Sequence, residues 1–329
     1  MLSPLSEAAH EDPLFRMAVA SLDLWPAFAA EIAAESGLDV EYRPAGKLHI
    51  AFDEAGESQL RSIRSRGAGF GVQLLAGHEA RAVEPVLSAD VIAALLVGRD
   101  HRVNNRILGE AAWKAASRGG VDFRLDSEAA EVVIGRDRRV SAVRLEDGTT
   151  IPTERVILAA GAWSGQIGGL PRLVPVEPVR GQMFAVDASK WRPGSRPFLE
   201  HTIDAPGCYF IPRDDGRILV GATVERAAFA AGPTPGGISM LLGAAIRAVP
   251  SIAGLPLAET WAGYRPGTPD DLPILGSDPD IAGIVYATGH FRNGVLLAPI
   301  TAAVVAALVE GTEPPVAIER FRPDRFDTE

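Results

Sequence analysis

The strongest constraint on the fold of this chain is the order in which helix and strand patterns follow one another. The first part alternates between helices and strands, the Pro- and Gly-dense stretch 171–276 is mostly strand, and the last part returns to strand and helix. Helix–strand alternation is typical of an α/β layer, and many short strands with turns are typical of an antiparallel sheet. We therefore predict an α/β (mixed α+β) fold in which a Rossmann-like layer is interleaved with a large, mostly antiparallel β-sheet.

Hydrophobic periodicity places the individual elements. Apolar residues at helical spacing predict helices at 13–36, 55–66, 78–83, 105–118, 236–249 and 294–309. Alternating or continuous apolar runs predict strands at 47–52, 72–75, 121–125, 130–134, 140–145, 155–160, 176–186, 209–212, 218–222 and 284–287. Pro26 is expected to kink or split the first helix, because proline removes a backbone donor and clashes with the preceding turn.

Composition narrows the compartment and the class of partner. Against 42 Asp and Glu the chain has 32 Lys and Arg, and its net charge of −10 argues against nucleic acid or an anionic membrane as partner. One cysteine, Cys208, excludes an intrachain disulfide, so a reducing, cytoplasmic compartment is expected. The N-terminal residues lack a signal-peptide pattern, the apolar run 294–309 is short for a membrane span, and the six histidines lack metal-ligand spacing.

Two glycine-bearing turns follow apolar strands. In 287–295 (ATGHFRNGV), Gly289 and Gly294 bracket a turn before an apolar helix, where free N–H groups suit an anion or an electron-rich ring edge. An ordinary strand-to-helix turn explains this segment equally well. In 158–165 (LAAGAWSG), small residues around Gly161 allow close approach to a ligand, although close packing of strand on helix is the slightly better explanation.

Two further residues are candidates for holding a small ligand. Arg265 stands between apolar and turn residues, where its fork matches a carboxylate, or else it forms a structural salt bridge with Asp270 or Glu259. Tyr209 lies on a strand from which its hydroxyl can reach a pocket, although a half-buried sheet tyrosine is commoner.

Taken together, these segments resemble the FAD-dependent amine oxidases of the D-amino-acid-oxidase (DAO) superfamily, and within it the glycine oxidases of bacterial thiazole and thiamine biosynthesis. The resemblance runs from Met1 to about Arg325. Its most specific stretches are 207–223, 261–276 and 287–299, and 156–165 and 178–184 support them.

The resemblance implies two interleaved domains. The FAD-binding domain would comprise 1–36, 99–170 and 277–325, and the substrate-binding domain 37–98 and 171–276. It also implies that Tyr209 and Arg265 hold the substrate carboxylate and that Arg292 is a second active-site arginine beside the flavin. The residues implied to contact the cofactor are Met1, Leu2, Ala130, Val132, Gly161, Trp163, Gly289, His290, Phe291, Arg292, Asn293, Gly294, Val295 and Leu296.

The implied reaction is oxidative deamination of glycine or a similar small amino acid, which with O₂ and water gives an oxo acid, ammonia or an amine, and H₂O₂. No dedicated catalytic base is assigned, because orientation and the chemistry of non-covalent FAD carry the reaction. Sarcosine and D-amino-acid oxidases or dehydrogenases of the same superfamily are the alternative, and Gly207 is expected to leave room for substrates larger than glycine. A homo-oligomer, a tetramer by family analogy, is expected.

One part of the family pattern is missing from this sequence. Members of the superfamily begin with a strand, a GxGxxG turn and a helix, and 67–71 (GAGFG) does not lie between a buried strand and a helix. We expect this unit to precede Met1, in a gene model that starts at an internal methionine. The alternative is a shortened, flavin-free protein that only binds small carboxylates.

Overall fold

The fold is known from a computed structural model, which describes residues 1–7, 12–191 and 196–327. Its helices are α1 (Pro4–Glu7), α2 (Pro13–Ser36), α3 (Glu54–Arg66), α4 (Gly77–Val83), α5 (Asn105–Arg118), α6 (Pro235–Ala248) and α7 (Ala298–Glu310). The 3₁₀ helices are η1 (Gly161–Gln166), η2 (Pro250–Gly254), η3 (Glu319–Phe321) and η4 (Pro323–Phe326).

The strands form three sheets. The large sheet has the order β12-β8-β11-β10-β9-β1-β3-β2, and every neighbouring pair is antiparallel except β1 with β9. Its strands are β1 (Lys47–Ala51), β2 (Val72–Ala76), β3 (Ala93–Val97), β8 (Glu177–Asp187), β9 (Thr202–Ala205), β10 (Cys208–Pro212), β11 (Arg217–Gly221) and β12 (Leu257–Gly267). This confirms the predicted mixed α/β fold with a large, mostly antiparallel sheet.

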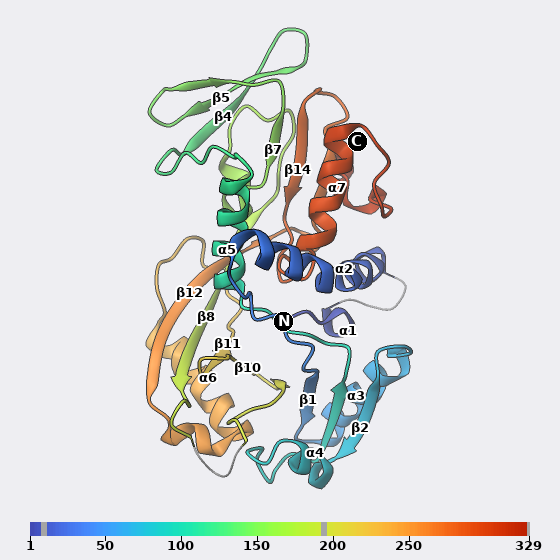
Figure 1. The fold of residues 1–329 in the computed structure, drawn as a ribbon, viewed down its shortest axis with the longest axis vertical. Helices are drawn as coiled ribbons and strands as arrows, with labels where there is room; N and C mark the ends of the chain where they lie inside the picture. The colour runs from blue at the N-terminus through green and yellow to red at the C-terminus, as the bar shows by residue number, and fades with distance from the viewer. Residues whose placement is uncertain (8–11, 192–195, 328–329) are drawn as a thin grey trace.

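Two smaller sheets lie at the other end of the molecule (Figure 1). One has the order β13-β14-β7, in which β14 and β7 run parallel, and the other is the antiparallel meander β4-β5-β6. Their strands are β4 (Ala129–Ile134), β5 (Val140–Leu145), β6 (Thr150–Pro152), β7 (Val156–Leu158), β13 (Ile274–Ser277) and β14 (Ile284–Thr288). The domain boundaries given above remain a prediction.

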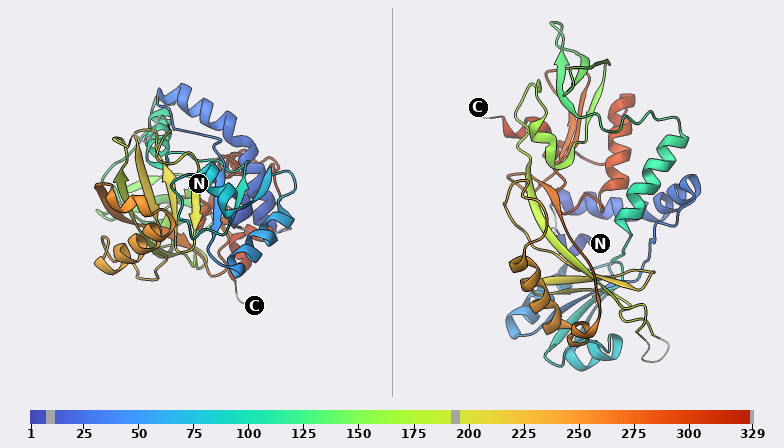
Figure 2. Two further views of the ribbon diagram at one scale, coloured as in Figure 1. Left: turned by 90° about the horizontal axis from the view of Figure 1, so that it is seen from below. Right: turned by 90° about the vertical axis from the view of Figure 1, so that its left-hand side faces the viewer.

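The two faces of the large sheet are different. One face packs against α6 through Phe184, Phe210, Val220 and Leu241, in a core that excludes water. The opposite face looks toward the middle of the molecule, where α2, α5 and the chain's first residues lie between the two ends (Figures 1 and 2). A face that is only partly covered by helices is where a small ligand can reach the sheet.

Helix α2 has one side buried in the core. By length and composition alone it is apolar enough to cross a membrane. Its Met17, Leu22 and Trp25 are at most 2% exposed, in a core shared with α5 and α7, so packing accounts for its apolar side. Of the two outcomes predicted for Pro26, a kink or a split, the split was wrong, because packing of Trp25 and Ala29 in that core holds one continuous helix through the proline.

Two further element predictions were wrong. Residues 121–125 form no strand: the alternating Val121, Phe123 and Leu125 are 40–69% exposed, and no described strand lies beside them to complete a ladder. The last apolar helix begins at Ala298 rather than at 294, because residues 294–297 form turns and Pro299 stands in the first turn of α7.

Candidate functional site

A row of residues crosses the partly covered face of the large sheet. Tyr209 of β10 pairs with Gly221 of β11, Gly221 with Met183 of β8, and Met183 with Trp261 of β12. Residues paired directly across neighbouring strands point to the same face, so the side chains of this row lie together. Gly221 contributes no side chain, and a Cβ there would lie 3.1 Å from the Tyr209 hydroxyl.

Tyr209 therefore reaches over Gly221 toward β8. Its hydroxyl lies 3.8 Å from the sulfur of Met183, and Tyr209 packs, like Met1, Met183 and Trp261, against the buried residues of this face, which are Ala185, Ile211 and Leu219. The structure thus brings Met1 to the same face as Tyr209, and Leu2 is tied beside it by two backbone hydrogen bonds with His101.

Arg265 reaches the same face from β12, four residues after Trp261. Its guanidinium lies over Gly181 of β8, where a Cβ would come within 2.5 Å of Nη1. Nη1 donates to the Thr223 carbonyl at 3.1 Å. The absence of a side chain at Gly181 leaves the space that the guanidinium fills.

The two acids named as salt-bridge partners of Arg265 pair with other arginines. Asp270 pairs with Arg325 at 2.9 Å and Glu259 with Arg106 at 2.8 Å. Arg265 is half-buried on a sheet face and bonds to backbone carbonyls, which leaves its fork suited to a carboxylate.

The two glycine turns meet at one edge of the β13-β14-β7 sheet. Gly161 follows β7 and Gly289 follows β14, and since these strands are parallel their carboxyl ends lie side by side. Ser164 and Thr288 join the two turns through a hydroxyl–hydroxyl hydrogen bond of 2.6 Å. Both glycines have positive φ, +54° and +72°, and Gly161 has open space where a Cβ would stand.

The loop from His290 to Leu296 is fastened to both of these regions. The Phe291 amide donates to the carbonyl of Pro266, the residue after Arg265, at 2.9 Å. This bond brings the backbone next to Arg292 close to the strand that carries Arg265. At the other end of the loop, the Leu296 carbonyl accepts from Ser21 Oγ and from Trp25 Nε1 of α2.

Sequence reasoning missed Ser21 and Trp25 as parts of this site. In the sequence they look like ordinary core positions of a helix, and only the fold shows that α2 contacts a loop residue 271 and 275 positions away from them. Gly181, Gly221 and Met183 were missed for the same reason, since no local pattern shows which residues face Tyr209 and Arg265.

The loop before α7 fits a polar ring edge or an anion. Among the described residues, no acceptor takes the amide hydrogens of Gly294, Val295 and Leu296. The Asn293 side chain is 5% exposed, and its Oδ1 has no partner in the described part of the chain. Buried polar groups are normally hydrogen-bonded, so three free amides beside an unsatisfied amide oxygen indicate a place for a polar ligand such as a flavin ring.

His290 lies behind that loop as a neutral side chain. Its Nε2 is 3.0 Å from Thr301 Oγ1 of α7. Burial lowers the pKa of His290 to about 4. It therefore holds the loop to α7 and does not carry a charge near neutral pH.

This burial predicts an acid-dependent loss of stability. Between pH 6.5 and about 4 the unfolded chain protonates His290 and the folded chain does not, so the contribution is present above pH 6.5 and lost as pH falls toward 4. The full loss is about 3 kcal/mol. We expect the melting temperature of the His290→Gln variant to fall less between pH 6.5 and 4.5 than that of wild type, whereas substitution of the exposed His78 leaves the pH dependence unchanged.

The other predicted cofactor residues lie elsewhere. The Gly168 amide donates to the Ala130 carbonyl, and the Val132 amide donates to the Gly168 carbonyl. These two backbone groups of β4 are therefore hydrogen-bonded within the chain. Trp163 is 48% exposed and stacks on Phe229, with ring centroids 5.2 Å apart, and it meets Tyr264 edge-on. The contacts of Trp163 are thus with aromatic rings of the large-sheet segment.

Two smaller points concern Cys208 and Gly207. Cys208 is buried on the α6 side, and burial raises the pKa of its thiol to about 12, so it remains a neutral thiol.

A Cβ at Gly207 would meet Ala244 of α6 at 3.2 Å. The expectation that Gly207 leaves room for substrate was therefore wrong, since this position faces away from Tyr209.

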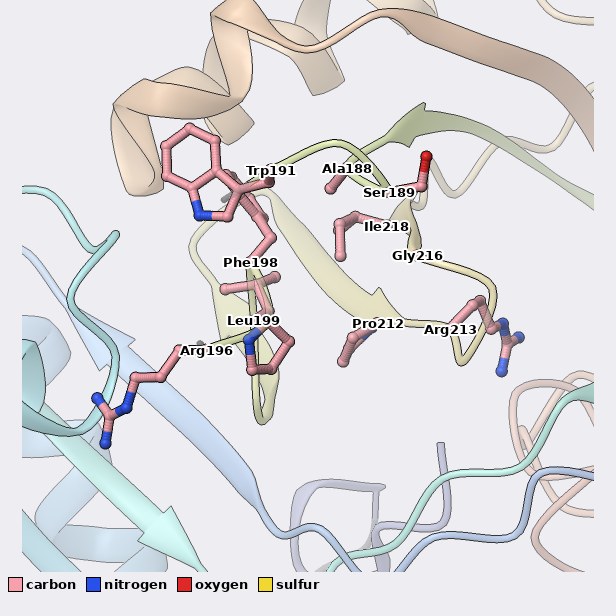
Figure 3. Close-up of a pocket in the computed structure, with 11 residues that line it drawn as sticks. Ala188, Ser189, Trp191, Arg196, Phe198, Leu199, Pro212, Arg213, Gly216 and Ile218 are labelled. Atoms are coloured by element: carbon pink, nitrogen blue, oxygen red, sulfur yellow. The ribbon is translucent and has the colours of Figure 1, made fainter. Parts of the chain in front are cut away.

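A separate pocket of about 460 Å³ lies at the far ends of β8, β10 and β11 (Figure 3). Trp191, Phe198, Ile218 and Arg213 line it, and Arg213 is bonded to the Val103 carbonyl at 2.9 Å. None of the residues predicted to bind substrate or cofactor lines this pocket.

Comparison with known proteins shows related sequences and structures over nearly the whole chain. Residues 1–308 match the model of a family described as FAD dependent oxidoreductase (DAO). A glycine oxidase from Geobacillus kaustophilus is 35% identical over 95% of this chain and 82% of its own length. The crystal structure of glycine oxidase from Geobacillus kaustophilus superposes with a TM-score of 0.90 at 32% identity, covering 98% of this chain and 86% of that one.

A longer relative matches over nearly the whole chain as well. The bifunctional protein ThiO/ThiG of Trichormus variabilis is 33% identical over 99% of this chain. That match covers 48% of the relative, so the chain spans about half the length of such proteins.

Proposed function

The chain belongs to the DAO family of FAD-dependent oxidoreductases, and from this premise we propose that it oxidises glycine or a similar small amino acid. The balanced reaction is amino acid, O₂ and water to oxo acid, ammonia or amine, and H₂O₂. The observation that carries the proposal is the position of Arg265, whose guanidinium lies over Gly181 on the same sheet face as the Tyr209 hydroxyl. Glycine oxidases with 30–35% identity are consistent with this substrate class.

The residues of the Gly161 and Gly289 turns, and of the loop before α7, have the chemistry that FAD binding requires. We propose that Gly161 and Gly289 allow close approach of the cofactor, and that the amides of Gly294, Val295 and Leu296 bind the polar edge of its ring. Asn293, with its unpaired Oδ1, is the matching side chain. Cys208 is a buried neutral thiol on the opposite face, which supports non-covalent binding.

The contribution of the protein to the reaction is mainly orientation. The Arg265 fork and the Tyr209 hydroxyl hold the substrate carboxylate and so fix the direction of the α-carbon. Bound FAD would supply the acceptor for the hydride, and with it the two electrons, removed from the substrate. His290 stays neutral and bonded to Thr301, so we assign no general base, and the amine reacts in its neutral form.

Arg292, Met1 and Leu2 complete the proposed site. Arg292 follows Phe291, whose amide is bonded to the residue after Arg265, and we propose that its charge acts between substrate and ring. Met1 packs against the same buried residues as Tyr209, and we propose that it borders the substrate on that side. Ala130, Val132 and Trp163 remain proposals from the family resemblance, although their bonded backbone groups and ring contacts do not bring them to this pocket.

A place in the synthesis of the thiamine thiazole, a cytoplasmic location and a homo-oligomer are part of the same proposal. They rest on the resemblance to glycine oxidases and on the relatives named ThiO/ThiG.

Release of H₂O₂ tests the proposal. The flavin-loaded protein is assayed with glycine, sarcosine, D-alanine and D-proline at equal concentrations. We expect peroxide from glycine at a rate above that from D-proline. Strong turnover of another amino acid with none of glycine would replace glycine as the substrate, and no peroxide from any of the four would refute amino-acid oxidation.

A further inference from the structure

A buried ionic cluster lies beside Tyr209 and takes no part in the proposed mechanism. It consists of Lys47 and His49 of β1 and Asp204 of β9. Lys47 Nζ lies 2.9 Å from Asp204 Oδ2 and donates to Ser6 Oγ at 3.1 Å, and His49 Nδ1 lies 3.2 Å from the same carboxylate oxygen. Charged groups are rarely buried without a functional or specific structural reason, because they lose their hydration.

The cluster continues the row of site residues along the sheet. His49 pairs with Asp204 across β1 and β9, and Asp204 pairs with Tyr209 across β9 and β10. All three side chains therefore lie on the face that carries Met183 and Arg265. Neighbouring strands are about 4.8 Å apart, so Asp204 flanks Tyr209 on the side away from Arg265 at a distance that a substituent of the substrate can bridge.

The three charged or polar groups are not equally accessible. The side chains of Lys47 and His49 are 2% and 7% exposed, whereas that of Asp204 is 35% exposed. The ammonium group of Lys47 is thus covered, whereas the carboxylate of Asp204 is partly exposed on the sheet face. A substituent that passes Tyr209 meets negative charge first.

The charge state of the cluster agrees with this orientation. Burial alone would raise the pKa of Asp204, but the charge of Lys47 and the hydrogen bond from His49 outweigh it and keep the carboxylate ionised. Burial lowers the pKa of His49, so that ring is neutral.

We propose that Asp204 is a specificity-determining residue: it excludes a second negative charge from the part of the substrate that extends past Tyr209, and so selects monocarboxylic over dicarboxylic amino acids. This inference rests on the proposed function, because it takes the first carboxylate to be held by Arg265 and Tyr209. Like charges placed together lower affinity strongly, and Asp204 repels a second carboxylate without affecting an uncharged substituent of the same size.

Binding of two unreactive ligands tests the inference without turnover. Oxydiacetate and its monoamide have the same shape through the ether oxygen and differ only in the charge at one end. Their affinities for the flavin-loaded protein are measured by calorimetry. We expect wild type to bind the monoamide about tenfold more tightly than the dianion, a difference of about 1.4 kcal/mol.

The variant Asp204→Asn should reduce this ratio to about threefold or less, because it removes the facing negative charge and, with it, the ion pair to Lys47. Asp215→Asn is the matched control, since Asp215 stands in the turn between β10 and β11 and pairs with Arg217. The control should keep the wild-type ratio, and so should Asp204→Glu, which keeps the charge.

Two results overturn the inference alone: equal binding of the two ligands by wild type, or an unchanged ratio in a folded Asp204→Asn variant. The wild-type ratio decides the question even where Asp204→Asn does not fold. If wild type binds neither ligand nor glycolate, the carboxylate clamp itself is refuted, and the proposed function and the inference fall together.

Discussion

The Arg265→Ala variant is expected to lose at least about a thousandfold in kcat/KM for the preferred amino acid. Arg265 provides the charge and the fork that hold the substrate carboxylate, and a thousandfold corresponds to about 4 kcal/mol of transition-state binding. Since Asp270 and Glu259 pair with Arg325 and Arg106 instead of Arg265, removal of Arg265 leaves neither carboxylate unpaired. We therefore expect the melting temperature to stay within a few degrees of wild type.

The control for this experiment is Arg217→Ala on the same sheet. Arg217 of β11 pairs with Asp215 at 2.7 Å and lies away from the Tyr209 end of the strand. It should keep kcat/KM within about twofold, as expected of an exposed ion pair. A loss below tenfold for Arg265→Ala would show that the carboxylate is held by other residues.

The Gly181→Ala variant is expected to lose about a hundredfold in kcat/KM although it leaves every proposed substrate residue in place. Its new Cβ would lie 2.5–2.6 Å from the Arg265 guanidinium nitrogens. The flexible end of the arginine yields, so folding is little affected, but the fork leaves the position that faces Tyr209. A misplacement of about 1 Å in a binding group can cost a hundredfold in rate.

Gly263→Ala is a closely matched control. Gly263 pairs directly with Gly181 across β12 and β8, and a Cβ there meets nothing within 4 Å. The two variants thus add the same methyl group at partnered positions, and steady-state kinetics with melting curves compares them. Equal activity of the two variants would mean that the guanidinium position over Gly181 is not the one that binds substrate.

The sequence allowed prediction of those elements whose pattern is local. The helix 105–118 and the strand 284–287 follow simple periodicity and end at glycine or polar residues, and both occur in the structure. Strand β12 escaped prediction because Gly263 and Pro266 interrupt its pattern. Its place at the edge of the sheet tolerates the proline, which pairs with Pro178.

Local patterns failed where a neighbour decides the outcome. Residues 121–125 alternate like a strand, yet an extended segment without a paired strand stays irregular and leaves Leu125 69% exposed. The candidate site shows the same division. Arg265, Tyr209 and the turn at Gly289 stand out in the sequence, whereas Gly181, Ser21 and Asp204 acquire meaning only through cross-strand register and packing.

The central claim is that this chain oxidises a small amino acid held by Arg265 with FAD bound at the Gly161 and Gly289 turns. The most direct test is anaerobic titration of the flavin-loaded protein with glycine, followed by its visible absorbance. We predict that glycine removes the flavin absorbance in wild type, that air restores it with one H₂O₂ per flavin, and that Arg265→Ala keeps its absorbance at the same glycine concentration. Equal loss of absorbance in wild type and Arg265→Ala, or none in wild type with any of the four amino acids, would contradict the claim.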